Sequence, residues 1–216
     1  MSTAPVRLRQ LARASAAERE QVLEHCELCG EPIPSAHRHL LDLESKEIMC
    51  ACQACKILFD RQAAGGSHYR LIPDRRLMLE DFALDDVGWA KLRIPVEMAF
   101  FFRNTEAERV DAFYPSPVGA TQSLLEFEAW DEIERDNPVL STLEPDVEAL
   151  LVNRARGARM HFVVPIDDCY RLVGMIRTRW RGLSGGEEVW KEIGAFYEDL
   201  TKRSKTVTND KEEATA

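Results

Sequence analysis

The sequence predicts an α+β protein in which a small cysteine-rich module precedes a larger domain of mixed helices and strands. Two observations support this prediction. Five of the six cysteines lie between residues 26 and 55, and such clustering in a cytosolic protein is typical of metal or redox chemistry. After Gly65-Gly66, apolar runs typical of strands alternate with segments of helical periodicity.

Changes in composition divide the chain into four predicted parts. Residues 1–24 form an N-terminal helical segment, 25–64 the cysteine-rich metal-binding module, 65–203 the α+β domain and 204–216 a disordered tail. Ser15 and Glu18 have the spacing of a capping box, which predicts a helix over 15–25. The tail is assigned because its residues are small, polar and charged.

Within the module, the sequence predicts a tight turn, a hairpin and a helix. The turn holds Cys26-x2-Cys29, the hairpin strands cover 39–43 and 47–52, and the helix covers 53–62. This order is that of a treble clef or a related zinc ribbon.

The larger domain is predicted from its apolar patterns. Strands are expected over 68–72, 76–79, 94–103, 109–114 and 160–165, and helices over 85–92, 127–136, 145–153, 167–180 and 187–203. Residues 115–119 are expected to form a rigid loop. Asp167 and Asp168 are expected to cap a helix, His161 to be a satisfied core histidine, and Cys169 to be a buried apolar residue.

The two cysteine pairs predict a metal site. Cys26-x2-Cys29 and Cys52-x2-Cys55 are separated by 22 residues. Two residues between thiolates let one turn direct both sulfurs at a single ion, and two such turns complete a tetrahedron around zinc. Iron is the alternative metal, because rubredoxin-like sites also use two Cys-x2-Cys turns. Zinc is favoured because Lys56, rather than glycine, follows the second pair.

Three further side chains lie close enough in sequence to take part. Cys50 and Cys52 point the same way on an extended strand, so Cys50 is an alternative ligand or a thiol next to the ligands. His37 and His39 could also ligate the metal or donate a hydrogen bond to a sulfur. The alternative is that they are ordinary surface or packing histidines with no role at the metal.

Charge and hydropathy exclude some classes of function. The net charge of −9 argues against sequence-independent binding of nucleic acid. No apolar run approaches the length of a membrane span, and the first 25 residues lack a secretory signal, so a cytoplasmic protein is expected.

Residues 94–155 are strongly acidic and could form a docking face. The alternative contact surface for a partner is a cluster of four arginines, Arg171, Arg177, Arg179 and Arg181.

No catalytic constellation is recognisable, so no enzymatic activity is expected. The sequence has no P-loop and no GxGxxG motif. A degenerate HNH-type nuclease is a distant alternative, suggested by His37-Arg-His39 between the cysteine pairs. That class of enzyme also needs an Asn and a further His, and neither occurs between His39 and Cys55.

Several stretches together carry a resemblance to a known family. They are CELCGEPIPSAHRHLLDLESKEIMCACQACKILFDRQAAGG (26–66), IPVEMAFFFR (94–103), FYPSPVGATQSLL (113–125), NPVLSTLEPDVEALLVNR (137–154), VPIDDCYRLVG (164–174) and WRGLSGGEEVW (180–190). With them the sequence resembles an uncharacterised bacterial family encoded beside high-affinity uptake nickel–iron hydrogenase genes. The resemblance implies no defined activity, but a supporting role in maturation, assembly or docking of that hydrogenase.

The sequence therefore predicts a non-enzymatic zinc protein that binds a hydrogenase subunit or maturation factor. The alternative is a rubredoxin-like iron protein, or a thiol redox protein, that serves the same hydrogenase.

Overall fold

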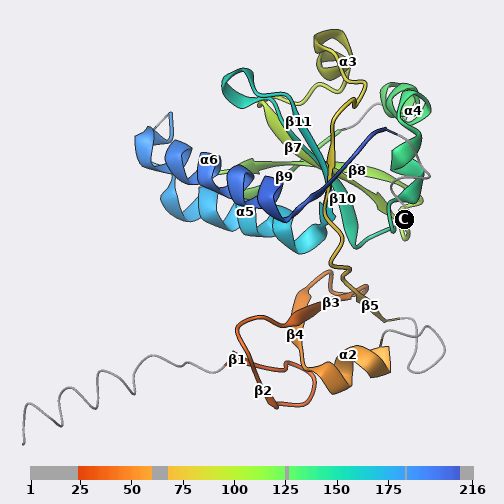
Figure 1. The fold of residues 1–216 in the computed structure, drawn as a ribbon, viewed down its shortest axis with the longest axis vertical. Helices are drawn as coiled ribbons and strands as arrows, with labels where there is room; N and C mark the ends of the chain where they lie inside the picture. Colours follow the sequence, from red (N-terminus) through yellow and green to blue (C-terminus); the bar gives the residue numbers. More distant parts are fainter. Residues whose placement is uncertain (1–23, 60–67, 125–126, 183, 210–216) are drawn as a thin grey trace, which may run out of the picture.

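The computed structural model describes residues 24–59, 68–124, 127–182 and 184–209. It has the predicted mixed α+β architecture, with a four-cysteine cluster followed by a sheet-rich domain with helices (Figure 1). The predicted helix over 15–25 lies outside the described residues except at its end, where Glu24–His25 forms strand β1. None of the described helices is long and apolar enough to cross a membrane.

The module is built from a knuckle, a three-stranded sheet and one helix. β1 pairs with β2 (Pro32–Ile33) around the first cysteine pair. β3 (Arg38–Asp42) pairs with β4 (Ile48–Ala51) as predicted, and helix α2 (Gln53–Phe59) follows. The other edge of β3 pairs with β5 (Tyr69–Leu71). The division predicted at residue 64 thus cuts this sheet, because β5 completes it from beyond that point.

Strand β3 contributes to two hydrophobic cores. Leu40 is buried with the cysteines, Ile33 and Ala51, whereas Leu41 is buried in the core of the larger domain, together with Ile72. Successive side chains of a strand point to opposite faces, so one strand can serve both cores. Arg38 also donates a hydrogen bond to the carbonyl of Ile72 at 2.8 Å. The module therefore packs against the domain through β3.

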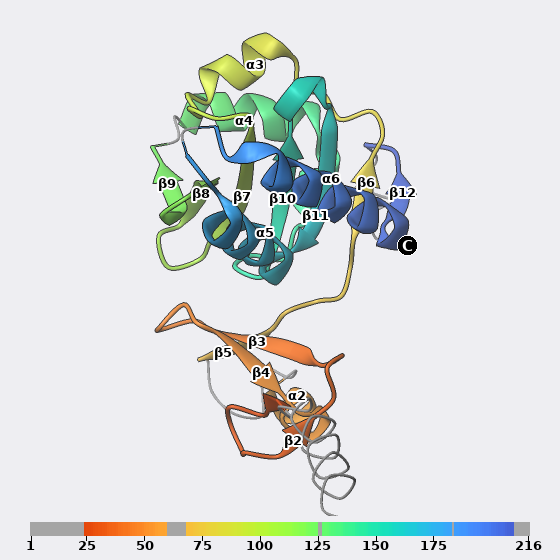
Figure 2. The ribbon, with the colours of Figure 1, turned by 90° about the vertical axis from the view of Figure 1, so that its left-hand side faces the viewer.

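The larger domain is organised around a seven-stranded sheet in the order β12-β6-β11-β10-β7-β8-β9. Its neighbouring strands are antiparallel except β12 and β6, which are parallel (Figure 2). The strands are β6 (Leu77–Leu79), β7 (Met98–Asn104), β8 (Arg109–Ser116), β9 (Gly119–Ser123), β10 (Glu148–Asn153), β11 (Met160–Pro165) and β12 (Lys205–Val207).

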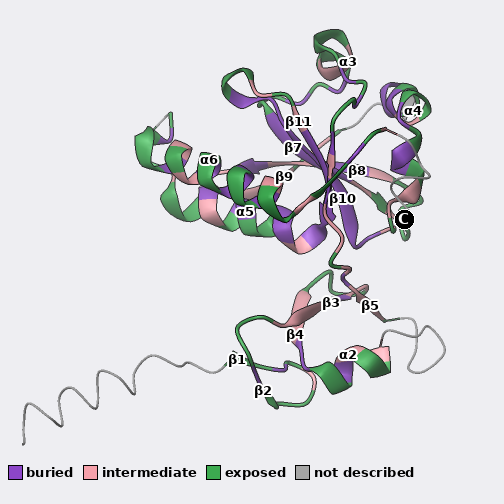
Figure 3. Ribbon diagram, in the orientation of Figure 1, coloured by how far each residue is buried: buried purple, intermediate pink, exposed green. Residues whose placement is uncertain are grey.

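Helices cover both faces of this sheet. α5 (Ile166–Arg179) and α6 (Gly186–Arg203) bury their apolar stripes in one core. α3 (Asp86–Lys91), α4 (Phe127–Asp136) and the 3₁₀ helix η1 (Pro138–Thr142) lie at the other. A short 3₁₀ turn, η2 (Ala155–Gly157), follows β10. Figure 3 shows the central strands buried between these layers and the outer faces of α5 and α6 exposed.

Three predicted elements differ from the structure. The helix expected over 145–153 is the central strand β10, and all six of its residues are buried. Its apolar run fits a strand that is covered on both faces, where alternation disappears. Of the loop expected over 115–119, residues 115–116 end β8 and residue 119 begins β9, and residues 117–118 form the turn of this hairpin. Residues 205–207, expected in the disordered tail, form β12 and bury Val207.

Part of the acidic middle is neutralised inside the protein. Glu148 is fully buried, and Arg75 donates to both of its carboxylate oxygens, at 2.9 and 2.5 Å. Asp146 is also buried and accepts from Arg70 of β5 at 2.9 Å. These two acids therefore bind segments of the fold together and do not belong to an exposed docking face.

Candidate metal centre

The first cysteine pair lies on the knuckle between β1 and β2. The backbone amide of Cys26 donates to the carbonyl of Glu31 at 2.8 Å, and Gly30 donates to the carbonyl of Cys26 at 2.8 Å. Gly30 has a φ of +78°, which a residue without a Cβ adopts at low cost. These contacts fold Cys26 and Cys29 into one compact turn.

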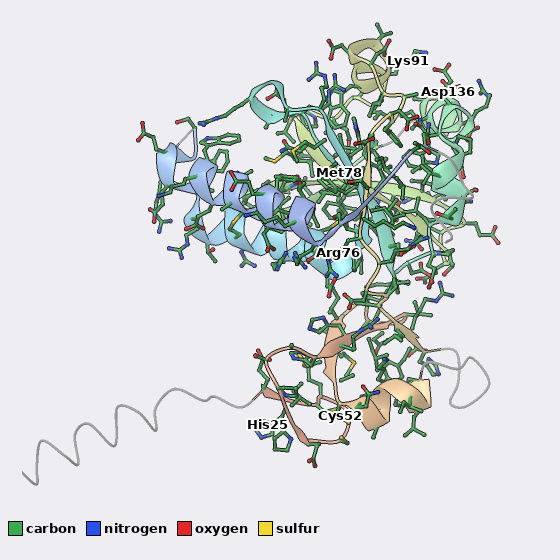
Figure 4. The ribbon with its side chains drawn as sticks, in the orientation of Figure 1. His25, Cys52, Arg76, Met78, Lys91 and Asp136 are labelled. Carbon is green, nitrogen blue, oxygen red and sulfur yellow. The ribbon has the colours of Figure 1, made fainter. Side chains whose placement is uncertain are left out.

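The second pair lies where β4 ends and α2 begins. Cys52, labelled in Figure 4, follows β4 directly, and Cys55 is in the first turn of α2. The backbone amide of Cys55 donates to Sγ of Cys52 at 3.4 Å, and Lys56 donates to the Cys52 carbonyl at 2.9 Å. These contacts hold Sγ and the carbonyl of Cys52 against the first turn of the helix.

The four sulfurs converge at one point. Sγ atoms of Cys26, Cys29, Cys52 and Cys55 all lie within 4.8 Å of one another, and those of Cys29 and Cys52 are 3.6 Å apart. Tetrahedral zinc with bonds of about 2.3 Å separates its sulfur ligands by roughly 3.8 Å. The donor set and its spacing therefore fit a tetrahedral metal ion.

Burial and hydrogen bonds act on these thiols in opposite directions. Burial raises the pKa of Cys26, but hydrogen bonds from the backbone of Cys52, Leu28 and Cys29 outweigh it and lower that pKa to about 6. Burial and the neighbouring thiols raise the pKa of Cys55 well above its usual range. A bound metal would have to displace the protons that remain, as is usual for thiolate sites.

The module has a small apolar core of its own. Cys26, Cys52 and Cys55 are buried with Leu40 and Ile33, and Cys29 is exposed. An open groove of about 730 Å³ runs past Cys29 and Cys52, lined by Pro32 and Pro34 among others.

Cys50, His37 and His39 do not join the four-cysteine cluster. They form a group of their own, whose ligand atoms lie within 4.8 Å of one another. The amide of Cys50 donates to the Glu27 carboxylate at 2.5 Å. Burial, followed by the negative charges of Glu27 and Glu24, raises the pKa of the Cys50 thiol.

The predicted arginine surface is partly occupied by contacts within the domain. Arg171 lies 3.0 Å from Asp168 and packs over the ring of Phe196, and Arg179 lies 3.4 Å from Glu192. Arg177 and Arg181 are exposed near the end of α5.

The expected capping role of Asp167 and Asp168 is wrong. α5 has no side-chain cap; instead, Asp168 accepts from Arg76 at 2.6 Å and Asp167 from His39 at 2.8 Å. The contact between His39 and Asp167 joins the module to the domain across 128 residues of sequence. No local signal in the sequence could have identified it.

Cys169 and His161 are both buried in the sheet domain. Cys169 is fully buried in the core, as expected. His161 is buried and stacks on Phe82 with ring centroids 4.7 Å apart. Its Nε2 has no hydrogen-bond partner among the described residues, so it is not the satisfied histidine that was predicted.

Comparison with known families gives one match. A family model described as a family of unknown function (DUF5947) matches residues 25–204, which cover both the module and the sheet domain. No curated protein and no solved structure matches the chain.

Proposed function

Because the chain belongs to the DUF5947 family, whose function is unknown, its own site is the guide, and we propose that it is a non-enzymatic zinc-binding accessory protein. The observation that carries the proposal is the convergence of Cys26, Cys29, Cys52 and Cys55. Four cysteine ligands leave no open position on the metal, which is typical of structural rather than catalytic zinc.

Zinc would act on the folding of the module. Its apolar core is small, and a structural zinc site contributes on the order of 10–16 kcal/mol of apparent binding energy at neutral pH. The knuckle, hairpin and helix follow one another in the order of a treble clef. We therefore assign the ion the role of holding these three elements together.

A protein partner is proposed from the surface around the module. Ile57 and Leu58 of α2 are large apolar residues that are 59% and 58% exposed, and we propose that they belong to the contact surface. The groove past Cys29 lies on the same module. Arg177 and Arg181 form a second candidate surface, suited to an acidic partner.

The identity of the partner rests on the sequence resemblance alone. The family that the sequence resembles is encoded beside uptake nickel–iron hydrogenases, so we propose a hydrogenase subunit or maturation factor as partner, in the cytoplasm.

Elemental analysis of protein purified anaerobically without added metal tests the zinc assignment. One or more zinc ions per chain and no colour are expected. Cys29→Ser should lower the zinc content by one ion, whereas Cys169→Ala, a control cysteine in the other core, should not. A zinc content of the double variant Cys29→Ser, Cys52→Ser equal to that of the wild type would refute the site.

Affinity purification from cells that make the hydrogenase tests the partner. Enrichment of a hydrogenase component by the wild type, and its loss with Ile57→Asp and Leu58→Asp, is expected. Absence of every such component, in wild-type and maturation-blocked cells, would refute the hydrogenase role but leave the zinc site standing.

Iron is the second candidate metal, because four thiolates in a tetrahedron also suit iron. The same preparation distinguishes the two. A red protein with iron, bleached on reduction, would replace the accessory role with a rubredoxin-like role in electron transfer.

A further inference from the structure

A second group of metal-ligating side chains lies between the module and the sheet domain. His37 directly precedes β3, His39 is in β3, and Cys50 is the direct partner of His39 in the β3–β4 ladder. One ring nitrogen of each histidine and Sγ of Cys50 lie within 4.8 Å of one another. The rings of His37 and His39 meet edge to face, with centroids 4.8 Å apart.

The hydrogen bonds of the two rings determine which nitrogen is available. Nδ1 of His39 lies 2.8 Å from Oδ2 of Asp167, and Nδ1 of His37 lies 3.0 Å from the carbonyl oxygen of Pro34. A carbonyl or an ionised carboxylate only accepts, so Nδ1 must be the donor in both rings. In the neutral imidazoles, Nε2 therefore carries the lone pair that a metal would use.

The carboxylate of Asp167 is suited to this arrangement. Its Oδ2 accepts a hydrogen bond from Nδ1 of His39 at 2.8 Å, and its side chain is 23% exposed. A carboxylate that accepts from the far nitrogen of a metal-bound histidine fixes the ring and increases its basicity.

Two buried polar atoms here lack partners within the described part of the chain. They are Nε2 of His37, whose side chain is 7% exposed, and Oδ1 of Asp167. Buried polar atoms are nearly always hydrogen-bonded, so an unpaired one calls for a missing ligand or water. Both residues line an open cavity of about 870 Å³ between the module and α5.

The charged residues that line the cavity are Arg38, Arg76, Arg171, Arg203, Asp74, Asp167 and Asp168. Arg171 and Arg203 lie 3.0 and 3.8 Å from Oδ1 of Asp168, and Arg38 donates to the carbonyl of Ile72. Arg76, which lies at the end of the domain facing the module (Figure 4), is paired with Asp168 and Asp74 at 2.6 and 2.5 Å. Glu24 places a carboxylate oxygen 3.2 Å from Nδ1 of His37.

We propose that His37 Nε2, His39 Nε2 and Cys50 Sγ form a second site for a divalent transition metal, with Asp167 as the positioning residue of His39. Two imidazoles and one thiolate suit borderline ions such as Zn²⁺, Co²⁺ or Ni²⁺. Three protein ligands leave a position for water or a small ligand, unlike the four-cysteine site. The site does not depend on the zinc assignment of the first cluster.

Stoichiometry tests the proposal directly. Reduced apoprotein is titrated with Co²⁺ under anaerobic conditions, and bound metal is counted after gel filtration. Wild-type protein should bind two equivalents, and His37→Gln with His39→Gln should bind one. The double variant should keep the absorption of cobalt bound to four thiolates, which shows that the module is folded. His68→Gln, which removes an exposed histidine, should still bind two.

A wild type that binds one equivalent, or a double variant that still binds two, overturns the proposal. If the double variant does not fold, the imidazole ¹⁵N resonances of wild-type protein decide. The second equivalent of Zn²⁺ should shift Nε2 of two histidines, and an absence of shifts overturns the site.

Asp167→Asn tests the positioning role. The stoichiometry should stay at two, while the affinity of the second equivalent should fall by about 10–100-fold, the usual effect of losing such a partner. If the affinity for the second equivalent of Co²⁺ is unchanged, Asp167 is not a positioning residue of this site.

Discussion

His161→Phe is expected to make the sheet domain more resistant to acid. His161 is buried in β11 and stacks on Phe82. Burial, with the positive charges of Arg154 and Arg159, lowers its pKa from 6.5 to about 4. The native state therefore keeps this imidazole neutral at pH values where the unfolded chain protonates it. Phenylalanine retains a ring on Phe82 and cannot be protonated.

The sign and size follow from proton linkage. Between pH 6.5 and 4 the unfolded state binds more protons than the native state, so stability falls as the pH is lowered through this window. A shift from 6.5 to about 4 corresponds to at most roughly 3 kcal/mol. Between pH 7 and pH 5 the same linkage removes about 2 kcal/mol from the wild type.

Urea unfolding at a series of pH values measures this difference. All four tryptophans lie after the module, so their fluorescence reports on the sheet domain. The free energy of unfolding of His161→Phe should fall by about 2 kcal/mol less than that of the wild type between pH 7 and pH 5. His68→Gln controls for loss of an imidazole at the surface. Parallel pH profiles for wild type and His161→Phe would refute the reasoning.

Three further tests of the packing of the domain use denaturant unfolding. Arg75→Met should lower the free energy of unfolding by about 3–5 kcal/mol because it leaves the buried carboxylate of Glu148 without its ion-pair partner. Adding Glu148→Leu should restore most of this stability. An Arg75→Met variant as stable as the wild type would contradict the prediction. Gly185→Ala should cost at least about 1 kcal/mol, because φ is +86° and the new Cβ would lie 2.9 Å from Cγ1 of Val189. Gly194→Ala, in open space on α6, should instead stabilise by up to about 1 kcal/mol, and equal effects of the two glycines would disprove the strain. Val207→Ala should cost about 1–2 kcal/mol because the side chain is buried, and no loss would mean that β12 does not stabilise the sheet.

The cysteine cluster was predictable because its information is local. Two Cys-x2-Cys turns define the ligands by spacing alone, and the hairpin and helix between and after them follow from short patterns. The separate group formed by Cys50, His37 and His39 was not predictable as a group. Its geometry depends on the register that places Cys50 opposite His39.

The sheet domain shows where local patterns mislead. Residues 148–153 have spacing compatible with a helix, but pairing with β7 and β11 makes them the buried central strand β10. Tertiary pairing overrides helical propensity in such a strand. The contact of His39 with Asp167 spans 128 residues, and so does not appear in any pattern of neighbouring residues.

The parallel pairing of β12 with β6 constrains the order in which a nascent chain can fold. Residues 205–207 close the edge formed by residues 77–79, so that edge has no permanent partner until more than a hundred further residues have been translated. An unpaired edge strand is a template for pairing with other chains. The early edge is only three residues long, and a short edge offers little to such a neighbour during synthesis.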